Sequence, residues 1–242
     1  MAFSYYLDQL EISTIRLIIM LIVPAIIPHT KEQLEEEVKK VSKFAHLIQI
    51  DISDGIFTPF KTWPYNGRDV DFFEKLKTQE VGWPKWEDVE YEIHLMVKSP
   101  ENILFDWINS GASAIIAHIE ATEDFQKVID VCREHSVAVG IAIKPSTDIA
   151  RIENFVSQVD FIQCMGSDEL GKHGVGLEDK AVMQIKSLQK IYPERIIAID
   201  IGVSEFTEEI LISAGADKLV SGSAILEASN PEEVFRQLQS LE

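Results

Sequence analysis

Short apolar segments rich in Val, Ile and Leu alternate with amphipathic helical segments from residue 21 onward. The apolar segments lack regular polar alternation, which is typical of parallel strands that are covered on both faces. The predicted strands are 21–27, 46–51, 91–97, 113–119, 138–144, 159–164, 196–201 and 218–222. Eight strands with helices between them, and no linker, predict a single (β/α)8 barrel of the α/β class.

The helical segments between the strands each carry one apolar stripe. In Lys31 to Phe44, Leu34, Val38 and Val41 recur at helical spacing. The other predicted helices are 71–77, 101–109, 124–135, 148–156, 179–192, 207–214 and 231–241, with a short helix at Ala224. The span 61–90 is longer and more aromatic than a βα unit requires. We expect an elaborated loop there, with tryptophans that form either a local hydrophobic cluster or a subunit contact.

Residues 1–19 precede the predicted barrel, which we assign to 20–242, and the pattern does not define the status of this N-terminal extension. The apolar stretch from Ile15 to Ile27 contains Arg16 and Pro24 and is shorter than the ~20 residues that a membrane span needs. The segment before it carries acids rather than the basic residues of a signal peptide. We therefore expect no membrane anchor and a cytoplasmic protein.

The composition narrows the classes of partner. The chain of 242 residues has a formal net charge of −18, which disfavours nucleic acid and anionic membranes, because both are bound largely through Lys and Arg. A small phosphorylated ligand stays compatible, since backbone amides and helix N-termini can bind one phosphate. The two cysteines, Cys132 and Cys164, form no disulfide framework and no paired-cysteine metal motif, which is typical of a reducing compartment.

Three ionisable side chains, Asp51, His94 and Asp200, lie in or at the end of apolar segments. Burying an unpaired charge costs several kcal/mol, so such residues usually pair, bind metal or perform chemistry. Parallel barrel strands all end on one face, where active sites of this fold lie. The three residues therefore predict a functional cluster, although each one alone would also fit a satisfied core group or a helix cap.

Further polar residues and glycines fall at the same predicted face. Gly202 follows the seventh strand, and Gly222 and Ser223 follow the eighth; in this fold these loops frequently bind phosphate. The glycine-rich loop 171–176, with Lys172, is a candidate lid, and the alternative for each glycine is an ordinary turn. Asp54, before a glycine, is expected to form a turn. The remaining polar residues predicted at this face are His118, Glu120, Lys144 and Ser221.

Several motifs occur in one order and spacing that together are specific. They are Asp51-Ile52-Ser53-Asp54-Gly55-Ile56-Phe57-Thr58-Pro59, His94-Leu95-Met96-Val97, His118-Ile119-Glu120-Ala121-Thr122-Glu123, Gly140-Ile141-Ala142-Ile143-Lys144-Pro145, Ala214-Gly215-Ala216-Asp217 and Val220-Ser221-Gly222-Ser223-Ala224-Ile225. From about Leu21 to the C-terminus, the chain resembles the ribulose-phosphate 3-epimerase family. The resemblance implies a TIM barrel of the ribulose-phosphate-binding type.

The resemblance also implies a reaction, a 1,1-proton transfer at C3 of a ketopentose phosphate through an enediolate. Asp51 and Asp200 match the acid–base pair of the family. A divalent metal, zinc or iron, would be held by those two aspartates and His94, with Gln49 at the position of a second histidine ligand. The residues expected to contact substrate and phosphate are Gly174, Gly176, Gly202, Gly222, Ser223, Met96 and Met165.

The chain departs from the family pattern in the site itself. Gln49 replaces a histidine ligand, and an amide oxygen is a poorer ligand than imidazole for zinc or iron. Ser53 replaces a methionine, Ala25 replaces a serine, and Ile201 replaces the first glycine of an Asp-Gly-Gly motif.

These departures leave three hypotheses open. The leading one is an epimerase acting on a phosphorylated ketose. The second is a sugar-phosphate isomerase or aldolase-type barrel with little or no metal, and the third is a non-catalytic barrel that binds sugar phosphates. The expected partner is a small sugar phosphate, and the chain could also form a homo-oligomer.

Overall fold

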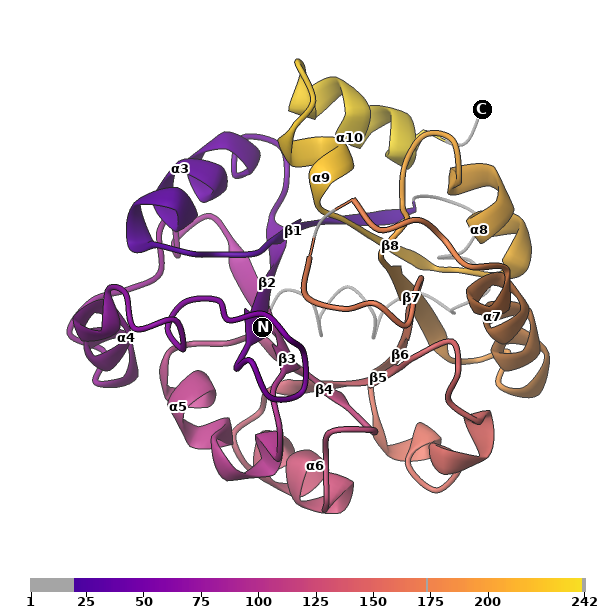
Figure 1. Ribbon diagram of the computed structural model, residues 1–242, viewed down its shortest axis with the longest axis horizontal. Coiled ribbons are helices and arrows are strands. Elements are labelled where there is room, and N and C mark those ends of the chain that lie inside the picture. Colours follow the sequence, from indigo (N-terminus) through magenta and orange to yellow (C-terminus); the bar gives the residue numbers. More distant parts are fainter. Residues whose placement is uncertain (1–19, 173, 241–242) are drawn as a thin grey trace.

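The eight apolar segments form one closed parallel barrel in a computed structural model that describes residues 20–172 and 174–240 (Figure 1). Each strand pairs with the next one in sequence, and β8 closes the barrel against β1. The strands are β1 (Leu21–Ile26), β2 (Leu47–Ser53), β3 (Glu90–Met96), β4 (Ala114–His118), β5 (Ala138–Ile143), β6 (Phe161–Met165), β7 (Ile196–Asp200) and β8 (Lys218–Ser221). The predicted TIM barrel is therefore confirmed. The predictions for 1–19, His173 and Leu241 fall outside the described residues.

Helices surround the barrel and cover its outer face (Figure 1). They are α3 (Lys31–Val41), α4 (Val70–Lys77), α5 (Leu104–Asn109), α6 (Phe125–Glu134), α7 (Asp179–Ile191), α8 (Glu208–Ala214), α9 (Ser223–Leu226) and α10 (Pro231–Gln239). Their apolar stripes pack on the strands; in α3, for example, Leu34, Val38 and Val41 are buried. Within residues 20–172 and 174–240, every helix is too short or too polar to span a bilayer.

Two connections differ from the helices predicted for them. The predicted helix 148–156 is wrong, because this span holds only two 3-10 turns, η2 (Ile149–Arg151) and η3 (Val156–Gln158). The Asp148 side chain caps the first turn by accepting a hydrogen bond from the Ala150 N–H. Ile149, Ile152 and Phe155 then pack against the core at a three-residue spacing, which matches 3-10 turns rather than an α-helix. The predicted helix 101–109 begins as a 3-10 turn, η1 (Pro100–Asn102), before α5.

The predicted aromatic span forms a cluster on one side of the barrel. Trp63 is fully buried and contacts Phe73, Trp83 and Trp107 edge to face. Such aromatic contacts stabilise beyond the area that they bury. Trp63 and Trp83 therefore belong to a local hydrophobic cluster, whereas Trp86 is largely exposed.

An ion pair is buried at the opposite end of the barrel from the strand C-termini. Lys218, at the start of β8, places Nζ 2.5 Å from Oε2 of Glu92 in β3, and both side chains are almost fully buried. Lys218 Nζ also lies 4.1 Å from the centroid of the Phe161 ring, a favourable cation–π position. The pair links two strands that are not neighbours in the barrel.

Candidate functional site

Asp51, His94 and Asp200 meet at the C-terminal face of the barrel. Asp51 and His94 are register partners on β2 and β3, and Asp200 is the last residue of β7. All three are buried, and each contributes one candidate ligand atom within 4.8 Å of the others. The barrel thus brings together three residues that lie on strands far apart in sequence.

Gln49 is a fourth member of this cluster and lies deeper in the barrel than the two carboxylates. It lies two residues before Asp51 on β2, so both side chains point to the same face of the strand. Its Nε2 donates to Asp51 Oδ1 at 2.8 Å and to Asp200 Oδ2 at 2.9 Å. Gln163 adds a further donor, with Nε2 3.3 Å from Asp200 Oδ2. The two carboxylates are therefore bridged by a neutral amide where an imidazole was expected from the family pattern.

His94 faces both carboxylates through one ring nitrogen. Its Nδ1 lies 2.9 Å from Asp51 Oδ1 and 3.3 Å from Asp200 Oδ2. Burial disfavours the charged ring, but the hydrogen bonds to Asp200 and Asp51 outweigh it and raise the pKa of His94 to about 9. A positive charge on His94 thus offsets part of the negative charge of the acid pair.

The two carboxylates of the pair do not ionise independently. Burial and the nearby charge of Asp200 raise the pKa of Asp51 above its ordinary value, and His94 and Gln49 oppose this only in part. Like charges held together in a buried site disfavour double ionisation. The pair can therefore hold a proton on one carboxyl group while the other remains ionised.

A cavity of about 450 Å³ opens above the acid pair. Its wall contains every residue expected to contact substrate and phosphate: Met96, Met165, Gly174, Gly176, Gly202, Gly222 and Ser223. Asp51 and Asp200 also line the cavity, whereas His94 and Gln49 are fully buried beneath it. This volume is in the range of small-molecule sites.

One wall of the cavity is apolar and strained. Met96, Met165 and Leu170 form a small buried cluster against which Phe57 and Ile201 pack. Ile201 has φ 78°, a left-handed conformation that is rare for a β-branched residue. The following Gly202 has φ 74°, and a Cβ there would lie 2.7 Å from Leu177 N. The loop after β7 therefore requires glycine at 202 and tolerates a strained residue at 201.

The loop after β6 covers part of the cavity. Lys172, Gly174 and Gly176 lie in its wall, and Lys172 Nζ forms an ion pair of 2.6 Å with Glu169. Asp54 does not line the cavity; its carboxylate accepts from the Ile56, Phe57 and Lys98 N–H groups, which confirms the turn-forming role predicted for it.

Three residues that line the cavity, Ser204, Thr207 and Glu227, were not assigned to the site from the sequence. His118, which was predicted at this face, contacts His94 with the two Nε2 atoms 3.0 Å apart. The alternation of His118 and Glu120 at a strand end was a usable signal, because residues two apart lie on the same side of a strand. No sequence signal pointed to Glu227.

The residues present fit a divalent cation. Two carboxylate oxygens and one imidazole nitrogen converge from three strands, and this donor set suits several divalent metals. Gln49 Oε1 is buried with no hydrogen-bond partner among the described residues. Rotating the amide by half a turn would bring this oxygen beside the candidate metal ligands Asp51, His94 and Asp200. The unpaired oxygen is therefore consistent with a fourth ligand of the metal.

Comparisons with known proteins agree with this geometry. The model of the family described as "Ribulose-phosphate 3 epimerase family" matches residues 21–226. Ribulose-phosphate 3-epimerase of Schizosaccharomyces pombe is 31% identical over 220 residues, which cover 90% of this chain and 92% of that protein. The Bacillus subtilis enzyme of the same name is 26% identical, with 90% and 97% covered. Among solved structures, 3-hexulose-6-phosphate synthase from Salmonella typhimurium shares the fold, with a TM-score of 0.66, 18% identity and 90% and 96% coverage.

Proposed function

Because this chain belongs to the ribulose-phosphate 3-epimerase family, we propose that it epimerises ribulose 5-phosphate at C3 by proton transfer between Asp51 and Asp200. The observation that carries the proposal is the buried acid pair at the floor of the cavity. Asp51 comes from β2 and Asp200 from β7, so they can approach a bound ketose from two sides.

The raised pKa of Asp51 gives the pair an acid and a base. Asp200 acts as the base and removes the proton from C3, the C–H electrons form an enediolate with C2, and Asp51 acts as the acid and returns its own proton to the opposite face of C3. The reverse reaction exchanges the two roles. Gln49 holds both carboxylates in place through its hydrogen bonds of 2.8 and 2.9 Å.

A divalent metal, zinc or iron in our proposal, would be held by Asp51, His94 and Asp200. The amide oxygen of Gln49 would join them only with the amide turned over, in which case Nε2 would no longer donate to the two carboxylates. When bound, such a cation supplies positive charge next to the substrate oxygens that become negative during proton removal. The residues themselves orient the carboxylates and exclude water, because all four side chains are buried.

The phosphate of the substrate would bind at the loops after β7 and β8. Gly202, Gly222 and Ser223 line that part of the cavity, and the first N–H groups of α9 have no partner within the helix. Lys172 and the glycines of the loop after β6 would cover the bound sugar, and Met96 and Met165 would pack on its carbon chain.

Two buried thiols without a disulfide support a cytoplasmic setting.

The second candidate function is that of a sugar-phosphate enzyme with little or no bound metal, and a specific observation favours it. Gln49 Nε2 donates to both carboxylates, and His94 carries a raised pKa of about 9. These two groups can stabilise the acid pair without a cation. Metal analysis of protein purified without chelator separates the two candidates. Stoichiometric zinc or iron supports the metal-dependent enzyme. Activity and fold that are both retained after chelation support the metal-free enzyme.

The test of the proposed reaction is deuterium exchange at C3 of ribulose 5-phosphate in heavy water. We expect exchange and conversion to xylulose 5-phosphate in the wild type, and losses of at least ~100-fold in Asp51→Asn and Asp200→Asn, as for a removed acid–base group. Asp71→Asn is the matched control, because Asp71 is an exposed acid on α4 outside the cavity wall. Background exchange in the wild type, with zinc or iron supplied, would contradict the proposal.

A further inference from the structure

His94 is connected on its far side to a second histidine and a carboxylate that the proposed reaction does not use. His118, the last residue of β4, places Nε2 3.0 Å from Nε2 of His94. Its Nδ1 lies 3.0 Å from Oε2 of Glu120. The two rings are nearly parallel, with centroids 5.1 Å apart and planes 26° apart. All three side chains are buried or nearly so.

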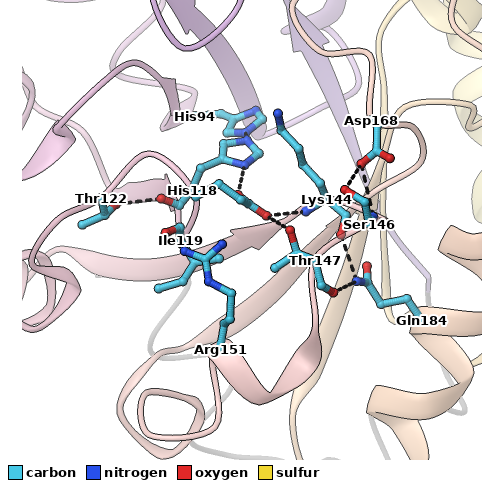
Figure 2. A network of polar contacts seen from close by, with 11 residues as sticks. His94, His118, Ile119, Thr122, Lys144, Ser146, Thr147, Arg151, Asp168 and Gln184 are labelled. Carbon is cyan, nitrogen blue, oxygen red and sulfur yellow. Dashed lines mark hydrogen bonds and ion pairs between the residues drawn. The ribbon is translucent and has the colours of Figure 1, made fainter.

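Glu120 is itself held in one orientation. Its Oε1 accepts from the backbone N–H of Lys144 at 2.8 Å and from the hydroxyl of Thr147. Gln184 of α7 donates to the carbonyls of Lys144 and Thr147 and so anchors that loop (Figure 2). One oxygen of Glu120 is thereby committed to the loop after β5, and the other is left to face His118.

Counting donors and acceptors fixes the position of each hydrogen. An ionised carboxylate only accepts hydrogen bonds, so His118 Nδ1 must carry the hydrogen that it donates to Glu120. Two ring nitrogens 3.0 Å apart need one hydrogen between them. A neutral imidazole that binds a cation through Nδ1 carries its single hydrogen on Nε2. A cation on Nδ1 of His94, beside Asp51 and Asp200, therefore puts that hydrogen on Nε2 of His94 and leaves His118 Nε2 as its acceptor.

The ionisation states agree with this count. Burial opposes the charge on Glu120, but the hydrogen bonds and charge of His118, with those of Thr147 and Lys144, lower its pKa to about 2. Glu120 is thus ionised near pH 7. The reverse arrangement would set a lone pair of His118 against the carboxylate of Glu120.

We propose that Glu120 and His118 are positioning residues that keep a hydrogen on Nε2 of His94 and so reserve its Nδ1 for the acid pair. Nδ1 can then take a proton or a cation beside Asp51 and Asp200, whereas Nε2 takes neither. Partners of this kind orient metal-ligating histidines and select their tautomer. The inference rests on the proposed function, because it gives His94 its role at the acid pair.

The direct test is nitrogen NMR of the full-length protein labelled with ¹⁵N-histidine, with and without zinc. We expect His94 Nε2 to be protonated, His118 Nε2 to be unprotonated, and a scalar coupling across the hydrogen bond between them. His118→Phe, which removes the coupled nitrogen, assigns the signals. A protonated His118 Nε2 in the wild type would overturn the proposal.

Glu120→Gln reverses the hydrogen-bond direction and gives a second readout. The new carbonyl oxygen stays on the donors of Lys144 and Thr147, so the new amide nitrogen donates to His118 Nδ1. His118 Nε2 then carries the hydrogen, and His94 carries its own on Nδ1. We expect this exchange in the NMR spectrum, with a 10- to 100-fold loss of zinc affinity and kcat and a KM changed by less than about twofold, since the phosphate loops are untouched.

Glu123→Gln is the matched control, because Glu123 is an exposed acid in the same loop. It should leave the histidine signals, zinc affinity and kcat at wild-type values. An unchanged tautomer in Glu120→Gln contradicts the proposal. The NMR measurement does not depend on catalytic activity. If the protein shows the expected spectrum but no exchange at C3, the proposed function is contradicted and the positioning role is supported.

Discussion

At the scale of single residues, Gln49 is the departure from the expected family pattern that lies among the candidate metal ligands. The amide bridges Asp51 and Asp200 as a donor, whereas its oxygen has no hydrogen-bond partner in the part of the chain that the structure describes. An imidazole at this position would offer a nitrogen ligand in place of an amide. The residue therefore sets how strongly the cluster binds a metal, and substitution at this position tests that role.

We expect Gln49→His to increase zinc affinity by on the order of tenfold or more, because imidazole is a better zinc ligand than an amide. Competition with a fluorescent zinc chelator measures the affinity. Gln49→Asn, which keeps the amide but shortens the side chain, is the control and should not gain affinity. Equal affinity in the histidine variant and the wild type would show that Gln49 does not limit metal binding.

Glu120 also predicts a pH dependence of stability. Its pKa is lowered in the folded state to about 2 from 4.5, so its contribution is fully present above pH 4.5 and is lost as the pH falls towards 2. We expect wild type to exceed Glu120→Gln by on the order of 3 kcal/mol in free energy of unfolding near pH 7, with the difference shrinking in acid. Urea titrations at several pH values measure it. A constant difference would contradict this prediction.

At the scale of elements, the strands were predicted well and the connections less well. Buried parallel strands are marked by continuous apolar runs, so all eight were found. The helix predicted at 148–156 is wrong because Ile149, Ile152 and Phe155 pack against the core every three residues. Short 3-10 turns satisfy this spacing, and in the sequence it is hard to distinguish from an α-helical stripe. Asp51, His94 and Asp200 were found because each interrupts or ends a strand. Glu227 and Thr207, in contrast, lie on surface-like segments and reach the cavity only through the tertiary fold.

The ion pair between β3 and β8 gives a prediction at this scale. Lys218→Met leaves Glu92 buried without its partner, and we expect a loss of about 3–5 kcal/mol in free energy of unfolding. The double variant Glu92→Leu with Lys218→Met removes both charges and should regain most of that stability. Chemical denaturation of the single and double variants measures the coupling. Additive losses would show that the two residues do not interact.

At the scale of the whole molecule, an acidic protein is expected to bind an anionic substrate. The net charge of −18 repels a sugar phosphate at long range, while the backbone amides and Lys172 attract it only within the cavity. Salt screens charges separated by more than about 10 Å at 0.1 M. Long-range repulsion and local attraction therefore respond differently to ionic strength.

We expect kcat/KM for ribulose 5-phosphate to rise by about twofold when sodium chloride is added from a low ionic strength up to ~0.1 M, because screening weakens the long-range repulsion. Sodium acetate at equal ionic strength controls for chloride bound at the phosphate loops. A steady fall of kcat/KM in both salts would show instead that local attraction governs association.

The bridging amide of Gln49 also has a genetic consequence. Glutamine and histidine codons differ only in their third base, so one transversion exchanges the amide for an imidazole beside Asp51, Asp200 and His94. The glutamine form and the histidine form of the cluster are thus separated by a single base change, with no intermediate residue between the two ligand sets. A lineage under changing metal supply could pass between them in either direction, and a selection based on pentose growth under zinc or iron limitation would enrich one codon over the other.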